Sequence, residues 1–253
     1  MGDLNSDIQS VLQLAQSQNP ALTVEAIGNL ANKYSEAECV AYLKKLTELK
    51  KYQAIFKKVY TDYILNMETV SVAGIISNPA SRSLDFLKVA PPEAATAYHR
   101  VDEIFDRIDL KKCKKFTMIG CGYLPVTAIQ AHQRSQEMKV AAIDISQAAI
   151  ESVYRLTAHC QLTRIDALCR NGAEYDYSDS DIIYVANMVS PKLSVWKQIK
   201  ATASRGAQVI VREPYSLGRL WADSLEESLG NSTVITYRGA GSRYLSRDVF
   251  YSL

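Results

Sequence analysis

Apolar residues recur with the period of an α-helix through the first 110 residues of the chain. Ile8, Val11, Leu12 and Ala15 follow an i, i+3, i+4, i+7 spacing, which places them on one face of a helix. Thr23 is predicted to be the N-cap of a second helix, because a polar side chain precedes an apolar-periodic stretch there. The beginning of the chain is therefore predicted to be all-helical.

Capping residues and prolines divide the rest of this helical region. Ser35 followed by Glu38 forms a capping box, so a helical segment begins there and continues as one or two long helices. Asn78-Pro79 ends that segment, and Pro91-Pro92 begins another helix. Lysine pairs at 44–45, 50–51 and 57–58 fall beside apolar positions. We interpret these pairs as a solvated helix face.

After residue 110 the period changes, and short β-rich runs alternate with helical stretches. The predicted strands are 116–119, 140–143, 164–168, 181–186 and 206–213, and the predicted helices are 125–138, 147–160, 193–202 and 217–229. Strand and helix alternating five times indicates right-handed crossovers and a doubly wound parallel sheet. Two final strands, 232–239 and 244–253, are joined by four residues, which is too short for a crossover, so they must be antiparallel.

The predicted fold class is thus α/β. A Rossmann-like sheet with a terminal antiparallel hairpin is the arrangement of S-adenosylmethionine-dependent transferases, and here an all-α N-terminal domain precedes it. The expected domains are residues 1–109, helical and covering the active site, and residues 110–253, the Rossmann-like cofactor domain.

Composition narrows the classes of partner. The 253 residues are 47% hydrophobic and 22% charged, as in a soluble enzyme, and a net charge of +2 does not argue for nucleic acid. No apolar run is long enough to span a bilayer, and the N-terminus does not have the pattern of a signal peptide. Five cysteines without a CxxC pair indicate reduced thiols, so we expect a cytoplasmic protein. The three histidines have no metal-ligand spacing, so no protein-bound metal is expected.

Polar and small residues follow four of the predicted strands, where an open α/β sheet binds ligands. Gly120 and Gly122 form a tight turn after the first strand, and Asp144 follows the second strand at the position that accepts hydrogen bonds from ribose hydroxyls. The residues expected around the cofactor are Gly120, Gly122, Tyr123, Pro125, Asp144, Ile145, Asn171, Gly172, Ala173, Ala186 and Asn187. Their positions at successive strand ends predict an adenosine site.

The glycine turn does not have the usual continuation. A dinucleotide stays open as the ligand, but without a third glycine to seat a pyrophosphate the turn favours adenosine without phosphates, as in S-adenosylmethionine. Methyltransferases commonly carry an acidic residue two positions before the first glycine, where this chain has Met118, and a small residue where it has Tyr123. We therefore expect that the methionine arm is not held as in a methyltransferase.

Three segments together resemble nicotianamine synthases. They are FTMIGCGYLPVTAI at 116–129, the stretch IIYVANMVSPKLSVWKQIKATASRGAQVIVRE at 182–213, and METVSVAGIISNPASRSLDFLKVAPPEAATAYHRVDEIF at 67–105. Within that superfamily the chain looks most like the bacterial opine-metallophore enzymes of the staphylopine and pseudopaline type. The resemblance implies transfer of one 2-aminobutanoate unit from S-adenosylmethionine to the amine of histidine, with release of methylthioadenosine. A downstream opine dehydrogenase is the implied partner, and a homodimer is a further expectation.

The same resemblance assigns roles to residues that spacing alone does not identify. Glu68 matches the family's glutamate, a base or positioning group for the acceptor amine, and Tyr98 matches its tyrosine, which would orient the reacting arm. Arg212, at the end of the fifth strand, is expected to receive a carboxylate. His99 and Tyr215 are further candidates near the substrate. Glu93 and His99 are also alternatives for the base.

Three other functions stay open from the sequence. Repeated transfer would make the protein a nicotianamine synthase, transfer of the methyl group would make it a small-molecule methyltransferase, and absence of turnover would leave an adenosine-binding sensor. The products formed from S-adenosylmethionine distinguish all three.

Overall fold

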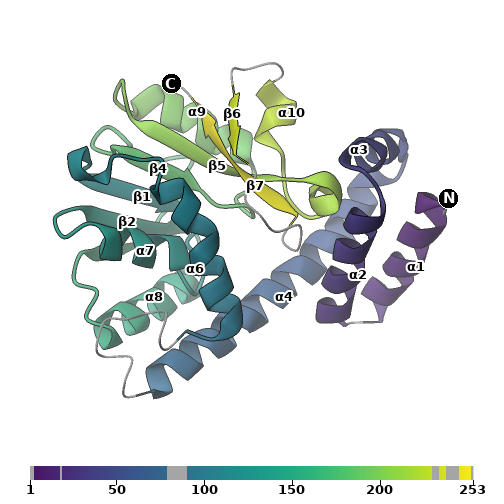
Figure 1. Ribbon diagram of the computed structural model, residues 1–253, viewed down its shortest axis with the longest axis horizontal. Coiled ribbons are helices and arrows are strands. Elements are labelled where there is room, and N and C mark those ends of the chain that lie inside the picture. Colours follow the sequence, from purple (N-terminus) through teal and green to yellow (C-terminus); the bar gives the residue numbers. More distant parts are fainter. Residues whose placement is uncertain (1–2, 18, 79–89, 230–233, 238–244, 252) are drawn as a thin grey trace.

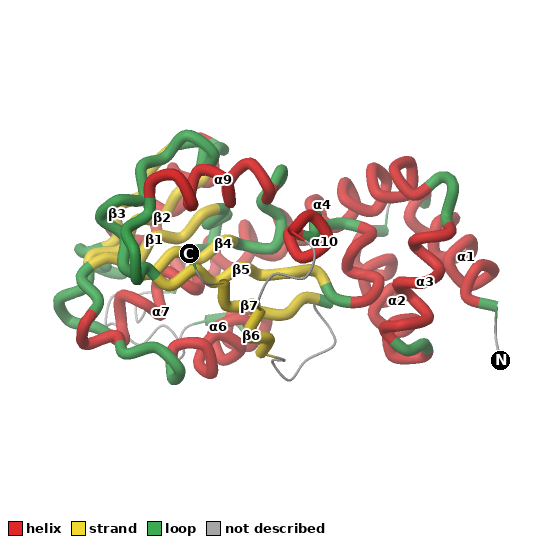
Figure 2. Tube along the Cα trace, turned by 90° about the horizontal axis from the view of Figure 1, so that it is seen from above, coloured by secondary structure: helices red, strands yellow, loops and turns green. Residues whose placement is uncertain are grey.

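The structure, a computed structural model of the chain, describes residues 3–17, 19–78, 90–229, 234–237, 245–251 and 253. A helical N-terminal part lies beside a part built on one sheet, and a single long helix, α4, runs diagonally between the two (Figure 1). Figure 2 shows the same division from above, with α1, α2 and α3 grouped away from the strands.

The first two helices are α1 (Leu4–Gln16) and α2 (Pro20–Lys33). The predicted apolar face of α1 is confirmed, because Ile8, Val11 and Ala15 are buried. The prediction that a helix begins at Thr23 is wrong, since Thr23 is a buried residue inside α2. Asn19 caps α2 instead and accepts the N–H of Leu22 at 3.2 Å. Proline is favourable at the first helical position, where its missing N–H has no helical partner to lose.

The next helices begin and end at the predicted capping residues. The capping box of Ser35 and Glu38 begins α3 (Glu36–Lys45), and a separate helix, α4 (Leu49–Ser77), ends immediately before Asn78. Pro91 is the N-cap of α6 (Pro92–Phe105), as the proline pair indicated. At 1.5 Å per residue, the 29 residues of α4 extend for about 43 Å.

The described residues form one seven-stranded sheet in the order β3-β2-β1-β4-β5-β7-β6. Their bounds are β1 Lys115–Ile119, β2 Lys139–Asp144, β3 Ile165–Cys169, β4 Ile182–Val185, β5 Gln208–Pro214, β6 Val234–Tyr237 and β7 Ser246–Tyr251. The first five strands are parallel, and β7 is antiparallel to both β5 and β6, so the predicted closing hairpin is confirmed. The order of the strands changes direction at β1, because the chain continues to β2 on one side of it and to β4 on the other, and such sheets bind ligands at this point.

The crossover helices are α7 (Val126–Arg134), α8 (Gln147–His159) and α9 (Lys192–Thr202). The first of them is shorter than predicted, because the Arg164 side chain donates hydrogen bonds to the carbonyls of His132 and Ser135 at 2.6 and 2.7 Å. These bonds satisfy carbonyls at the end of α7 without a further helical turn.

Two regions depart further from the predicted alternation. The predicted helix over 217–229 is instead a 3-10 helix, η3 (Ser216–Leu220), followed by the short helix α10 (Leu225–Leu229). Gly218 lies so close to residue 245 that an added Cβ would stand 2.1 Å from the Leu245 carbonyl oxygen. This close approach requires a residue without a Cβ at position 218. Between β3 and β4 no helix forms over residues 170–181, all of which are described.

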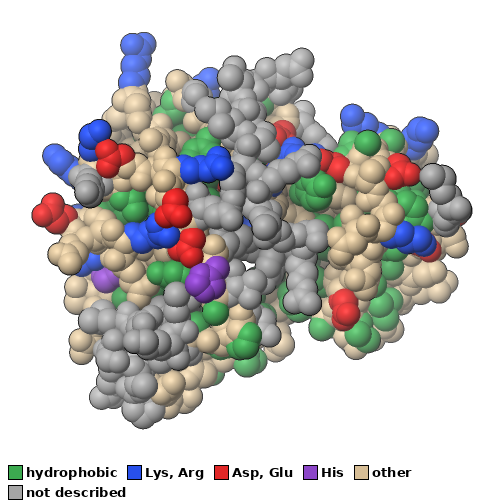
Figure 3. Space-filling model, in the orientation of Figure 1, with side chains coloured by type: hydrophobic (Ala, Val, Ile, Leu, Met, Phe, Trp, Pro, Cys, Tyr) green, Lys and Arg blue, Asp and Glu red, His purple; other side chains and the backbone are tan. Residues whose placement is uncertain are grey.

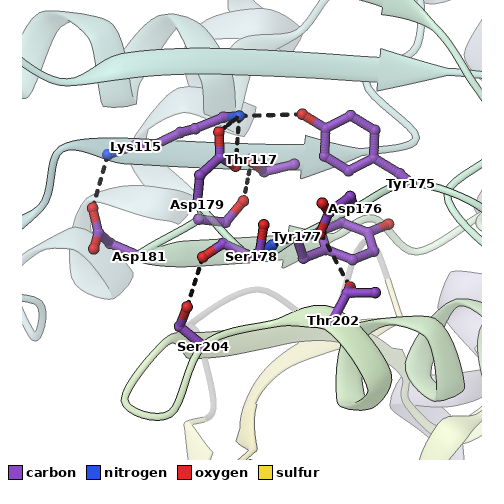
Figure 4. Close-up of polar contacts among 11 residues, drawn as sticks. Lys115, Thr117, Tyr175, Asp176, Tyr177, Ser178, Asp179, Asp181, Thr202 and Ser204 are labelled. Atoms are coloured by element: carbon purple, nitrogen blue, oxygen red, sulfur yellow. Dashed lines mark hydrogen bonds and ion pairs between the residues drawn. The ribbon is translucent and has the colours of Figure 1, made fainter.

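Polar contacts hold this irregular connection at the amino end of the sheet (Figure 4). The Lys115 ammonium contacts the Asp179 carboxylate at 2.7 Å and the Tyr175 hydroxyl at 3.2 Å. One Asp181 oxygen accepts the N–H groups of Lys114 and Lys115 at 2.6 and 2.9 Å. These bonds replace the packing that a crossover helix would supply, and they lie at the opposite end of the strands from the ligand-binding edge.

The hydrophobic cores do not divide at residue 110. One core combines buried residues of α4 and α6, including Ile75 and Val101, with Phe116 of β1 and Val140 of β2. A second core combines α1, α2, α3 and the beginning of α4 with η3 residues such as Trp221. Residue 110 therefore precedes the strands, whereas these two cores meet within α4, after Tyr60; a third core packs α9 against the sheet.

Charged side chains of both signs occur on the surface. On the face shown in Figure 3, cationic and anionic side chains are interspersed. Among the residues that the structure describes, no helix is both long and apolar enough to cross a membrane.

Candidate active site

A cleft of about 440 Å³ lies where the carboxyl ends of the strands face one side of α4. The strand ends contribute Gly120, Gly122, Asp144, Ile145, Asn171, Gly172, Ala186, Asn187 and Arg212, all of which the sequence predicted as site residues. The helix contributes Lys57, Tyr60, Thr61, Ile64, Met67 and Glu68. This i, i+3, i+4, i+7 spacing places the six side chains on one face of α4.

The glycine turn after β1 has its backbone donors occupied. The N–H groups of Gly120 and Cys121 both donate to the Ile143 carbonyl, at 2.8 and 3.0 Å. The Gly122 N–H donates to the Asp144 carboxylate at 3.0 Å. The Tyr123 N–H donates to the Glu68 carboxylate at 2.8 Å. A turn whose N–H groups are all satisfied by the protein cannot also bind a ligand carboxylate through them.

Both glycines of the turn are required by its geometry. Gly120 has φ of +75° and Gly122 has φ of +66°, in the left-handed region that disfavours side chains. A Cβ on Gly122 would stand 2.6 Å from Oε2 of Glu68, and one on Gly120 would stand 2.6 Å from Cγ2 of Val189. The glycines therefore admit Glu68 on one side of the turn and the segment after β4 on the other.

Glu68 lies in an environment that disfavours its charge. The pKa of the carboxyl is raised to about 7. Removal from water is the largest cause, the N–H groups of Tyr123 and Leu124 oppose it, and the nearby Asp144 carboxylate adds to it. The side chain is half-buried and opens on the cleft. A carboxylate with a pKa near neutral pH is suited to accept and release a proton there.

The ends of β2 and β3 form the other side of the turn. Asp144 accepts the N–H of Gly122 through one oxygen and the N–H of Ser146, at 2.9 Å, through the other. Ile145 is 75% exposed, which makes it an open apolar surface in the cleft. Gly172 packs tightly, because an added Cβ would lie 2.6 Å from Ile119. An acceptor carboxylate beside an apolar surface fits a ribose and its attached base.

The ends of β4 and β5 differ in how their polar groups are satisfied. Both amide atoms of Asn187, which is 8% exposed, lack a hydrogen-bond partner among the described residues. Arg212, by contrast, donates to Ser246 at 2.9 Å, Tyr184 at 3.2 Å and Asp248 at 3.3 Å. Nε and Nη1 of Arg212 are thus already used inside the protein, which leaves fewer donors for the carboxylate that it is expected to receive.

Six predicted site residues lie outside the cleft lining. The Tyr98 hydroxyl donates to Gln133 at 2.8 Å and its ring packs in the core, while Ala94 and Ala97 of the same helix line the cleft. His99 is exposed and paired with Asp102 at 3.0 Å. The other four are Tyr123, Pro125, Ala173 and Tyr215, of which Tyr123 contributes its backbone N–H and Pro125 the N-cap of α7. The side chain of Glu93 lies outside what the structure describes.

Lys57 and Tyr60 are cleft residues that sequence reasoning missed. Lys57 was interpreted with Lys58 as part of a solvated face, but only Lys58 is paired on the surface, with Asp62 at 2.5 Å. Lys57 lines the cleft, and the structure gives it no ion pair or hydrogen bond with any described residue. Burial lowers the pKa of Lys192 to about 8, and the charge of Lys57 lowers it slightly further. Because the Lys192 ammonium donates to the Arg212 carbonyl, Lys57 lies toward the end of β5. Tyr60 stacks on Trp221, with ring centroids 4.4 Å apart.

No group of three or more His, Cys, Asp or Glu side chains in the described ranges is arranged to hold a metal ion.

Comparison with known proteins places the fold. No family model matches the chain, and no curated protein matches it. Among solved structures, nicotianamine synthase MtNAS in complex with MTA and tNA superposes with a TM-score of 0.79 at 12% identity, over 100% of this chain and 99% of that one. A glutamate-to-glutamine mutant of MtNAS with S-adenosylmethionine gives 0.74 at 12% identity, over 98% and 97%.

A second class of structure matches less of the chain. A candidate S-adenosylmethionine-dependent methyltransferase from Methanococcus maripaludis gives a TM-score of 0.50 at 14% identity, over 72% of this chain and 93% of that one. The nicotianamine synthase structures extend the match over the helical N-terminal part as well. The chain therefore has the fold of nicotianamine synthase, a Rossmann-like sheet with a helical part before it.

Proposed function

We propose that this protein transfers the 2-aminobutanoate group of S-adenosylmethionine to the amine of histidine, releasing methylthioadenosine, in the synthesis of a nicotianamine-like opine metallophore. The observation that best supports this proposal is the position of Glu68: its carboxylate, whose pKa is raised, binds the backbone of the glycine turn near Asp144. It supports arm transfer because it places a proton acceptor at the turn and takes the N–H donors to which an arm carboxylate would otherwise bind.

The strand order supports a direction for the bound co-substrate. Asn171, Asp144, the glycine turn, Asn187 and Arg212 follow β3, β2, β1, β4 and β5, which are successive neighbours in the sheet. At about 4.8 Å per strand, the row covers about 19 Å. Adenosine at β3 and β2 leaves the sulfonium near the β1 turn and the acceptor toward β5, on a single line.

The chemistry assigns each group a task. S-adenosylmethionine supplies a carbon activated by the positive sulfur. The acceptor nitrogen bonds to the arm carbon that is attached to sulfur, and the bond between that carbon and sulfur breaks with its electron pair going to sulfur. The nitrogen's proton passes to the Glu68 carboxylate and then to solvent. Asp144 would hold the ribose hydroxyls. Lys57, a cleft cation on α4, would attract the acceptor carboxylate, because two nitrogens of Arg212 are already used inside the protein.

The product assay tests this function. Purified protein with S-adenosylmethionine and either enantiomer of histidine should give methylthioadenosine and a histidine heavier by one aminobutanoate unit. S-adenosylhomocysteine with methylated histidine would replace the proposal by a methyltransferase. Several units on one acceptor would replace it by a nicotianamine synthase activity. No turnover with any amino acid, despite binding of the cofactor, would indicate a sensor.

A further inference from the structure

The glycine turn has no backbone donor left for the charged head group of the methionine arm. Its N–H groups are held by Ile143, Asp144 and Glu68, and the position that is acidic in methyltransferases is Met118. The head group of the arm carries an ammonium and a carboxylate, and neither can lose water in the cleft without a protein partner. Another polar group must therefore hold it.

Asn187 has the required properties. Its carboxamide oxygen and nitrogen both lack partners in the described structure, although the residue is only 8% exposed and lines the cleft. A buried amide without partners is costly, so such a group is expected to be satisfied by a ligand. By contrast, the Asn171 amide, at the other end of the cleft, donates to Glu174 and accepts the Ala173 N–H, both at 3.0 Å.

The backbone places Asn187 on the side of the turn away from the ribose. The Ala186 N–H donates to the Ile119 carbonyl at 3.0 Å, so the end of β4 is fixed directly beside the end of β1. The Val189 N–H donates to the Ala186 carbonyl at 3.3 Å, which closes a turn that includes Asn187. Asp144 lies across β1 from this turn. An arm that leaves a sulfonium near Gly120 in the direction away from the ribose reaches Asn187 next.

We propose that Asn187 binds the amino acid head group of the 2-aminobutanoate arm. Its oxygen accepts from the ammonium of the arm, and its NH₂ group donates to the carboxylate. This proposal rests on S-adenosylmethionine as the co-substrate of the proposed function and adds the residue that places the arm for displacement. The two hydrogen bonds that Asn187 makes are those that a zwitterionic head group, and not the adenosine, can complete.

Calorimetry with two ligands tests the assignment without turnover, because methylthioadenosine has the same adenosine as S-adenosylmethionine but lacks the arm. Asn187→Ala should bind S-adenosylmethionine about ten- to a hundredfold more weakly, from the loss of hydrogen bonds to charged groups, with unchanged affinity for methylthioadenosine. Unchanged methylthioadenosine binding also shows that the variant is folded. Asn171→Ala is the matched control, and its effect should fall equally on both ligands.

A charged variant sharpens the test. The aspartate of the Asn187→Asp variant should repel the arm carboxylate and attract the arm ammonium. The variant should therefore bind S-adenosylmethionine more weakly than the wild type does. It should bind decarboxylated S-adenosylmethionine, whose arm keeps only the ammonium, more tightly. Equal losses for methylthioadenosine and S-adenosylmethionine, or no loss for either, would overturn the assignment. So would wild-type protein that binds neither ligand. A methylated product alongside the ligand-specific loss would refute the proposed reaction while leaving the role of Asn187 standing.

Discussion

The Glu68→Gln variant tests two effects of the Glu68 carboxylate separately, its destabilisation of the fold when ionised and its contribution to turnover. The pKa of Glu68 is raised from the ordinary 4.5 to about 7, so the folded protein binds a proton more tightly than the unfolded chain does. Below pH 4.5 both states hold the proton and the cost is absent. As pH rises toward 7 the unfolded chain gains by ionising first, and stability falls. At 1.36 kcal/mol per pH unit, the cost above pH 7 is at most about 3 kcal/mol.

Glutamine keeps the shape and an oxygen that can accept the Tyr123 N–H, but it does not ionise. We therefore expect the free energy of unfolding of the Glu68→Gln variant, measured by urea denaturation without ligand, to exceed that of the wild type by up to about 3 kcal/mol at pH 8. The difference should disappear near pH 4.5. Glu151→Gln, on an exposed face of α8, is the matched control and should show no pH-dependent gain.

The same variant should lose turnover by about 10²–10⁴-fold at neutral pH, the usual contribution of a general base. In the wild type, kcat/KM should fall tenfold per pH unit below about pH 7, where Glu68 becomes protonated, and this limb should be absent from the variant. A stability difference that is the same at pH 4.5 and pH 8 would refute the desolvated carboxylate. Near-native turnover at pH 7 would show that another residue takes the proton.

Three further variants test the rest of the cleft. Asp144→Ala should weaken S-adenosylmethionine binding tens-fold, at about 1.5–3 kcal/mol for a bond to a charged acceptor, and unchanged affinity by calorimetry would place the ribose elsewhere. Gly122→Ala should lower the free energy of unfolding by more than the cost of left-handed backbone strain, which is about 1–2 kcal/mol, because the added Cβ would also clash with the Glu68 carboxylate. Gly206→Ala is the control, since Gly206 has φ of +96° and no atom near its Cβ position. In the same denaturation assay it should show the strain alone. Lys57→Met should raise the KM for the acceptor severalfold without changing S-adenosylmethionine affinity, whereas Lys58→Met should change neither, and equal effects would remove Lys57 from the acceptor site.

The sheet could be predicted because its signals are local. Runs such as Phe116–Ile119 and Val140–Ile143 are short, apolar and bounded by turn residues, and parallel strands buried on both faces require that composition. Pro91 and the Ser35–Glu38 box act on neighbouring backbone groups, so helix ends were visible as well. The helix expected over 217–229 failed because its apolar residues pack against residue 245, a contact that periodicity does not report.

The cleft could be predicted less completely than the sheet, because it is formed by contacts between residues that are distant in the sequence. The glycines and Asp144 follow from strand ends, but the occupation of the turn by Glu68 joins residues 55 positions apart. Periodicity places Lys57 and Lys58 on different sides of α4 without saying which side meets the sheet. Tyr98 has the same ambiguity on α6, where its neighbours Ala94 and Ala97 line the cleft instead.

Because α4 is one continuous helix, the packing of the N-terminal helices affects the position of Glu68. Tyr60 is fixed in the core of that part, and Glu68 follows eight residues later on the same rod, about 12 Å away. A tilt of only about 5° around Tyr60 would displace Glu68 by about 1 Å, enough to break its 2.8 Å bond to the turn. Glu68 thus lies between two packed segments of one helix, with Tyr60 in the core of the N-terminal helices and Val72 and Ile75 in the core of the sheet, so the packing of both cores sets its distance from the turn.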